Sequence, residues 1–125
     1  MTRPVSTVAA AVWTLLVIVS LLLPGSSVPE SHLLQFDKVV HAFLFGVGVF
    51  LWLRVPWGSR RVRWAIILAA LVLAPASEIF QQALGNGRSA DPMDALADIV
   101  GIVLGSALWL LLRRRRNATI RRSVR

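Results

Sequence analysis

The chain has 125 residues, of which 56% are hydrophobic, and its mean hydropathy is +0.67. This composition is too apolar for a soluble domain of this size and indicates an integral membrane protein. The formal net charge of +8 would also suit a nucleic-acid binder, but the distribution of the basic residues favours a membrane, so no nucleic-acid partner is expected. The absence of cysteine excludes disulfides, cysteine-ligated zinc and a thiol nucleophile.

Four apolar segments have the length that crosses a hydrocarbon core, about 20 residues in a helix. They predict transmembrane helices over residues 5–23, 38–55, 62–82 and 92–112. The expected fold is therefore an all-α, four-helix transmembrane bundle over residues 1–112, followed by a basic tail over residues 113–125. A cleaved signal peptide is the alternative for the first segment, but its apolar run exceeds the usual length of about 7–15 residues and no A-x-A-like site precedes Ser26.

Basic and acidic residues are separated along the chain. Twelve of the 14 Lys and Arg residues lie at the N-terminus, between the second and third segments, or in the tail. All 6 acidic residues lie in or near the other two loops, around residues 24–36 and 81–93. By the positive-inside rule, we expect a multi-pass protein of the plasma membrane with both termini in the cytoplasm and the acidic loops on the outer side.

Three pairs of polar residues, each four residues apart, lie near the acidic ends of the last three segments. The pairs are Asp37 with His41, Glu78 with Gln82, and Asp94 with Asp98. This spacing places each pair on one helical face, with the inner member about 6 Å deeper at about 1.5 Å per residue. A charged Asp at the centre of a membrane helix costs about 2.5–3.5 kcal/mol on insertion scales, so these residues are expected to have a structural or functional role. We expect His41, Glu78 and Asp98 to converge on one extracytoplasmic site.

Several roles are open for such a site. His41 could act as a general base, with one carboxylate fixing its tautomer and another serving as the acid. The candidate catalytic residues are His41, Glu78 and Asp94, and the candidate substrate-binding residues are Asp37, Lys38, Gln82, Arg88 and Asp98. In this interpretation Lys38 and Arg88 hold a phosphate or carboxylate group of the substrate.

Two further interpretations of the polar residues differ from catalysis. The groups could form a hydrogen-bonded network that braces the bundle. They could also bind a metal through nitrogen and oxygen ligands, but no compact His-x-x-x-His spacing supports this, so no metal is expected and no cofactor is identified.

Glycines and arginines indicate further contacts. Gly101 and Gly105 form a G-x-x-x-G pattern, which predicts close approach of another helix. Packing within the chain is the first interpretation, and a homo-oligomer through the same glycines is the alternative. The arginine-rich tail is expected to bind the membrane lipids of the cytoplasmic leaflet.

Four motifs follow one another between about residues 36 and 106. They are Asp37-Lys38-x-x-His41, Glu78-x-x-x-Gln82, the lone Arg88, and Asp94-x-x-x-Asp98-x-x-Gly101. In this order they resemble the VanZ-like family of small bacterial membrane proteins, which is named for a protein associated with resistance to the glycopeptide teicoplanin. The resemblance implies a factor of the cell envelope. Asp98 departs from the pattern, because the family usually has asparagine there, and a carboxyl group replaces the amide.

Sidedness and resemblance together lead to one expected function. The protein is expected to bind or modify an anionic, lipid-linked envelope precursor at the outer leaflet and to affect glycopeptide susceptibility. The alternative is a non-enzymatic assembly or interaction subunit whose polar cluster braces the bundle. A proton-coupled exporter dimer is less favoured, because the acidic groups gather at one face, where alternating access would favour a site at the midplane.

Overall fold

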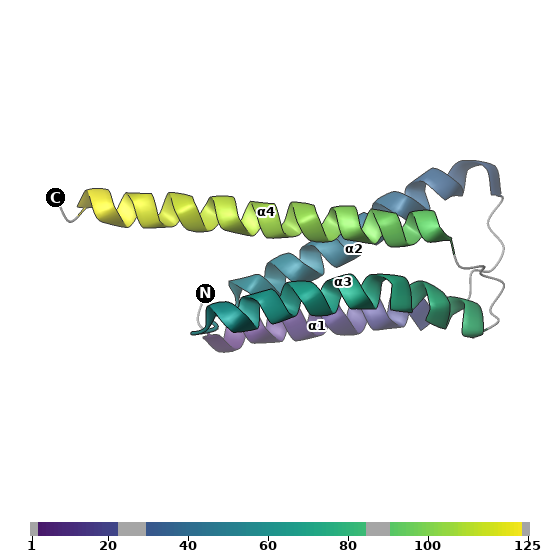
Figure 1. The fold of residues 1–125 in the computed structure, drawn as a ribbon, viewed down its shortest axis with the longest axis horizontal. Helices are drawn as coiled ribbons and strands as arrows, with labels where there is room; N and C mark the ends of the chain where they lie inside the picture. The colour runs from purple at the N-terminus through teal and green to yellow at the C-terminus, as the bar shows by residue number, and fades with distance from the viewer. Residues whose placement is uncertain (1–2, 23–29, 85–90, 124–125) are drawn as a thin grey trace.

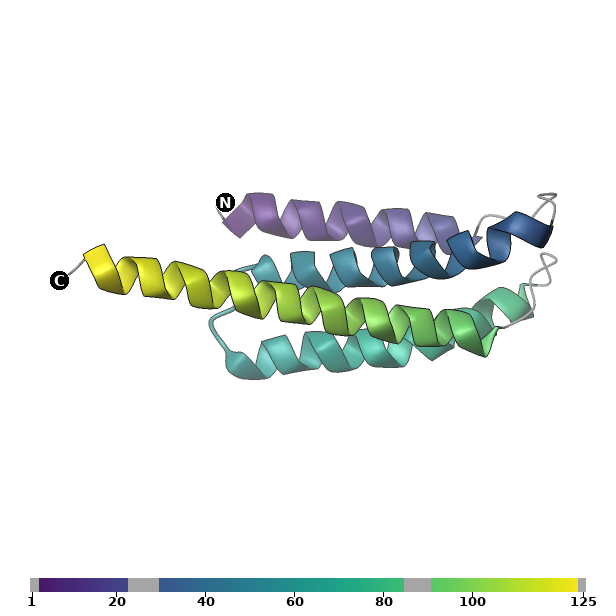
Figure 2. The same ribbon diagram turned by 90° about the horizontal axis from the view of Figure 1, so that it is seen from above.

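A computed structural model describes residues 3–22, 30–84 and 91–123, and every regular element within these ranges is an α-helix. The helices are α1 (Arg3–Leu22), α2 (Glu30–Arg54), α3 (Arg60–Ala83) and α4 (Pro92–Ser123). The C-terminal ends of α1 and α3 lie at the same end of the bundle as the N-terminal ends of α2 and α4 (Figures 1 and 2). The prediction of an all-α chain with four helices is confirmed for the described residues.

The outer surface of the bundle is strongly apolar. Leu15, Leu68 and Leu104 are each at least 60% exposed, and many other large aliphatic side chains are exposed with them. Two helical stretches, Arg60–Ala83 and Pro92–Thr119, are long and apolar enough to cross a membrane, and Pro4–Ser20 is a shorter apolar helix. Because a continuous apolar surface is unfavourable in water and favourable in hydrocarbon, these features indicate a membrane protein.

The closest helix packing occurs between α2 and α4, where glycines meet backbone. A Cβ added to Gly101 would lie 2.0 Å from the carbonyl oxygen of Ala42, and one added to Gly105 would lie 2.1 Å from that of Gly46. Any side chain at these two positions of α4 would therefore overlap the backbone of α2. The G-x-x-x-G pattern serves packing within the chain. A homo-oligomer through the same glycines stays a prediction.

Two tryptophan side chains join α1 to α2. Nε1 of Trp13 donates a hydrogen bond to the carbonyl oxygen of Leu44 at 2.9 Å, and Nε1 of Trp52 donates to Oγ1 of Thr14 at 2.9 Å. An indole N–H inside an apolar bundle needs an acceptor, so both bonds favour one position of α1 along α2.

A small apolar core lies between α2, α3 and α4. Its buried members are Val49, Leu53, Ala74 and Ile102. Each helix contributes at least one of them, so the three helices that carry the predicted polar pairs also share the core. The polar pairs are thereby held on elements that pack directly against one another.

Two helices are longer than the sequence predicted. α2 begins at Glu30 rather than at residue 38, because residues 30–54 contain no proline and an acidic residue is favourable at the positive end of a helix. α4 continues through the arginine-rich segment instead of ending at residue 112, since neither proline nor glycine follows Gly105. The predicted tail is thus mostly a helical extension that projects beyond the other helices (Figures 1 and 2).

Replacing Gly101 with alanine should destabilise the bundle. The added methyl group would force α2 and α4 apart, and overpacking of this kind typically costs about 1–3 kcal/mol. The measurement is the Tm of the purified protein in detergent. Gly58→Ala is the matched control, because a Cβ at Gly58 meets nothing within 4 Å and its Tm should equal that of the parent. Equal Tm values for the two variants would contradict the described packing.

Candidate functional site

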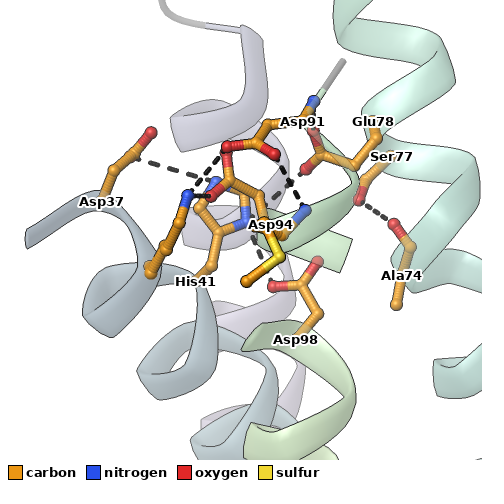
Figure 3. Close-up of polar contacts among 10 residues, drawn as sticks. Asp37, His41, Ala74, Ser77, Glu78, Asp91, Asp94 and Asp98 are labelled. Carbon is orange, nitrogen blue, oxygen red and sulfur yellow. Dashed lines mark hydrogen bonds and ion pairs between the residues drawn. The ribbon is translucent and has the colours of Figure 1, made fainter. Parts of the chain in front are cut away.

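Three buried side chains from three helices meet near the end of the bundle where α4 begins (Figure 3). His41 of α2 is 4% exposed, Glu78 of α3 is 5% exposed, and Asp98 of α4 is 0% exposed. Nδ1 of His41 lies 3.1 Å from Oδ1 of Asp98, which is hydrogen-bonding distance, and 3.7 Å from Oε1 of Glu78. We call these three residues the inner tier. The structure brings together the residues for which the spacing predicted a common site.

The glycine packing of α2 against α4 positions this inner tier. Gly101 contacts Ala42, which directly follows His41 in the sequence. Asp98 precedes Gly101 by three residues and therefore lies on the same face of α4, almost one turn away. The close approach at Gly101 thus brings the carboxyl group of Asp98 against the imidazole ring of His41.

A second group of polar contacts, the outer tier, lies nearer the N-terminus of α4. Nζ of Lys38 donates hydrogen bonds to Oδ2 of Asp91 at 2.8 Å and to Oδ1 of Asp94 at 3.0 Å. Asp94 is 8% exposed and the side chain of Lys38 is 32% exposed, so the Lys38–Asp94 ion pair is partly buried. Lys38 is therefore engaged by two carboxylates from α4 and the residue before it, and a substrate anion would have to compete with them.

Asp91 connects the outer tier to the start of α4 and to the inner tier. Its Oδ1 accepts a hydrogen bond from the backbone N–H of Met93 at 2.8 Å, which is the bond expected of an N-cap residue followed by proline at the first helical position. Its own backbone N–H donates to Oε2 of Glu78 at 3.4 Å. The cap of α4 and the inner carboxyl group of α3 are thus linked through one residue.

Carboxyl groups outnumber basic groups in this cluster. The acidic members are Asp37, Glu78, Asp91, Asp94 and Asp98, whereas Lys38 and His41 are the basic members that the structure describes. Within the described part of the chain, Oε1 of Glu78 and Oδ2 of Asp98 are buried and accept no hydrogen bond. A buried polar atom without a partner costs about 1–3 kcal/mol, so the inner tier has unused capacity for a proton or a cation.

The other predicted site residues occupy different environments. The side chain of Asp37 is 45% exposed, and its Oδ1 lies 4.0 Å from Nε2 of His41. Gln82 is exposed, whereas its neighbour Gln81 is 5% exposed and points its amide into the protein. Arg88 lies outside the described residues.

The sequence matches a known protein family. A family model described as VanZ/LLP1 matches residues 4–113, which is most of the chain. The chain belongs to the VanZ/LLP1 family. No curated protein and no solved structure matches it. The match includes all residues of both tiers, and it extends the resemblance, first drawn over residues 36–106, to α1.

Sequence analysis did not single out two polar residues of this VanZ-like protein, Asp91 and Gln81. Asp91 directly precedes Pro92, and its carboxylate caps α4 with one oxygen and binds Lys38 with the other. Gln81 was passed over for Gln82, although residues three and four positions after Glu78 both share its helical face. The i+3 spacing was the available signal for Gln81.

The electrostatics of the outer tier are clearest at Asp91. The hydrogen bond from Lys38, and then the bond from the backbone of Met93, hold the pKa of Asp91 below its ordinary value of 3.8. A carboxyl group whose pKa is lowered in the folded state stabilises that state above its unfolded pKa. This contribution disappears as the pH falls through the lowered value of the folded protein.

Replacing Lys38 with methionine should therefore lower the Tm at neutral pH, and the difference from the parent VanZ-like protein should shrink below about pH 4. As the pH falls through the lowered pKa of Asp91, this carboxyl group becomes protonated, so losing the ammonium group costs less. Thermal unfolding in detergent at a series of pH values measures this. Arg60→Met, an exposed change at the opposite end of the bundle, should show no such pH dependence. A Tm difference for Lys38→Met that stays constant down to pH 3 would contradict the assigned ion pairs.

Proposed function

We propose that this protein spans the plasma membrane four times, with both termini in the cytoplasm, and that its polar cluster binds the anionic headgroup of a lipid-linked envelope precursor at the outer leaflet. The single observation that carries the proposal is the inner tier. Ionisable side chains are rare inside membrane bundles, and those present usually mark a functional site.

The charge at the two ends of the bundle supports this orientation. Arg54 ends α2, Arg60 begins α3, and the exposed arginines at residues 113–116 lie on the part of α4 that extends at the same end. The opposite end carries the outer tier, with its excess of carboxyl groups. Under the positive-inside rule, the arginine end is cytoplasmic and the cluster faces outward.

Introduced cysteines test this orientation without background, because the chain has no cysteine of its own. Leu84→Cys, just after α3, should react with a membrane-impermeant maleimide added to intact cells. Gly58→Cys, between α2 and α3, should react only after permeabilisation. Both native residues are exposed, so accessibility within the protein does not limit either reaction. The reverse labelling pattern would contradict the proposed orientation.

Binding of an anionic headgroup would use the polar residues in different ways. Lys38 and Arg88 would supply positive charge, with the anion competing against Asp91 and Asp94 for Lys38. Carboxyl and amide groups at Asp37 and Gln82 would accept or donate hydrogen bonds at the margin of the site. The consequence for the cell would be an altered precursor at the membrane surface and an altered susceptibility to glycopeptide antibiotics.

Modification of the headgroup would require a general base, and His41 has the matching environment. Its ring nitrogen lies against Asp98, an arrangement in which a carboxylate can hold one tautomer of the imidazole. Glu78 and Asp94 are the candidates for the acid. Binding without chemistry needs none of these proton transfers.

Contacts between α2 and α4 favour a second candidate function. The His41–Asp98 contact and the Lys38–Asp94 ion pair both join these two helices, as does the glycine packing. In a non-enzymatic assembly or interaction subunit, such bonds would brace the helix pair against rearrangement.

Alanine at His41 should remove the protein-dependent change in glycopeptide susceptibility, because it removes the imidazole from the inner tier. Val40→Ala, at the adjacent position with a 47% exposed side chain, is the matched control and should behave like the parent. The measurements are the Tm, the membrane level of each variant, teicoplanin susceptibility and the profile of lipid-linked precursors, with the last two related to the amount of protein in the membrane.

The two candidate functions give different outcomes in this experiment. Loss of the phenotype with a normal Tm and normal membrane level supports headgroup binding. A lowered Tm and lowered membrane level, with the remaining protein still active, supports the bracing role. Unchanged susceptibility and unchanged precursors in His41→Ala would contradict the headgroup proposal.

A further inference from the structure

We propose that His41, Glu78 and Asp98 bind a divalent cation inside the helix bundle. Each residue comes from a different helix, and one ligand atom from each lies within 4.8 Å of the other two. All three side chains are buried. One imidazole nitrogen with two carboxylate oxygens is a donor set suited to Zn²⁺ or Mn²⁺.

The distances between the donor atoms agree with this assignment. In a tetrahedral site with bonds of about 2.0–2.1 Å, neighbouring ligand atoms are separated by about 3.3 Å. Nδ1 of His41 lies 3.1 Å from Oδ1 of Asp98 and 3.7 Å from Oε1 of Glu78, on either side of that value. Small side-chain movements would therefore let one ion contact all three residues.

Two unpaired oxygens provide independent support. Oε1 of Glu78 and Oδ2 of Asp98 are buried and accept no hydrogen bond from any residue that the structure describes. The first lies 3.7 Å from Nδ1 of His41, and the second would allow Asp98 to bind with both oxygens. Two buried carboxylates beside a neutral imidazole carry two negative charges, which a divalent cation would neutralise.

The atoms left over after ligation face polar groups. Nε2 of His41 lies 4.0 Å from Oδ1 of Asp37, and Oε2 of Glu78 accepts the backbone N–H of Asp91. Metal-binding histidines commonly direct their second nitrogen at a carboxylate, which orients the ring. The surroundings of His41 and Glu78 thus resemble those of metal ligands.

A shallower group of Asp37, His41 and Asp94 also has its ligand atoms within 4.8 Å. The inner tier is the better site, because Lys38 already neutralises Asp94 and the side chain of Asp37 is 45% exposed. With Nδ1 of His41 bound to the ion, Nε2 would carry the proton and face Asp37, so His41 would not serve as a general base. The inference goes beyond the proposed function, since it requires neither a lipid nor an antibiotic.

The test is metal binding to the full chain in detergent, purified with a tag that contains no histidine and stripped with EDTA. His32→Gln serves as the background, because His32 is the only other histidine in the sequence. Calorimetric titration with Zn²⁺ and with Mn²⁺ should show one ion per chain, and the ion should raise the Tm. Asp98→Asn, which keeps the shape and removes the charge, should weaken the affinity by about tenfold or more.

Glu30→Gln is the matched control, because it also replaces a carboxyl group with an amide, at a residue that belongs to neither tier. Its affinity should stay close to that of the background protein. Equal affinities for Asp98→Asn and Glu30→Gln would overturn the proposal, as would the absence of binding by the background protein. The envelope phenotype is not part of this experiment, so its outcome is independent of the proposed function.

Cobalt provides a second measurement if Asp98→Asn does not fold. Co²⁺ added to the stripped background protein should give visible absorption of the intensity expected for four nitrogen and oxygen ligands, and Zn²⁺ should abolish it by displacement. A spectrum no different from Co²⁺ in detergent buffer would overturn the proposal without any change to the inner tier.

Discussion

The close approach of α2 and α4 is the constraint on which the rest of the molecule depends. Gly101 and Gly105 place backbone against backbone, and no other residue type could occupy these positions without separating the helices. Because Asp98 lies almost one turn from Gly101, this packing also determines which side chain faces His41. The close packing at the two glycines thus determines which side chains meet in the inner tier.

A second property of the cluster is that its charges do not balance. Lys38 compensates Asp91 and Asp94 near the end of α4, whereas the buried pair Glu78 and Asp98 has only the imidazole of His41 among the described residues. In a membrane, the hydrocarbon around the bundle would offer no water to screen this difference. A proton, a cation or the positive part of a ligand would each offset the excess negative charge. Binding of any of the three would therefore change the stability of the bundle.

Much of this arrangement could be predicted from sequence. Each feature that could not be predicted has a physical reason. Residues four apart define a helical face, so the common depth of His41, Glu78 and Asp98 followed from counting turns inward from the charged ends. The rotation of α3 did not follow, since Gln81 and Gln82 both neighbour Glu78 and only packing against the other helices buries the first. The structure differs from the predicted start of α2 and the predicted end of α4, because the length of an apolar segment indicates only where the chain could cross a membrane. A helix can continue beyond that segment until a helix-breaking residue or a cap ends it.

The uninterrupted course of α4 links the two faces of the molecule. Its 32 residues correspond to about 48 Å at about 1.5 Å per residue, compared with about 30 Å for the hydrocarbon core of a bilayer. Asp94 and Asp98 lie in the first two turns of α4, and exposed arginines at residues 113–116 lie toward its C-terminal end. Neither proline nor glycine follows Gly105, so the part of α4 beyond this residue is expected to be straight and rigid. The polar cluster and the arginines therefore lie on one continuous helix, so a tilt of α4 that begins at its N-terminal turns would also move its basic end.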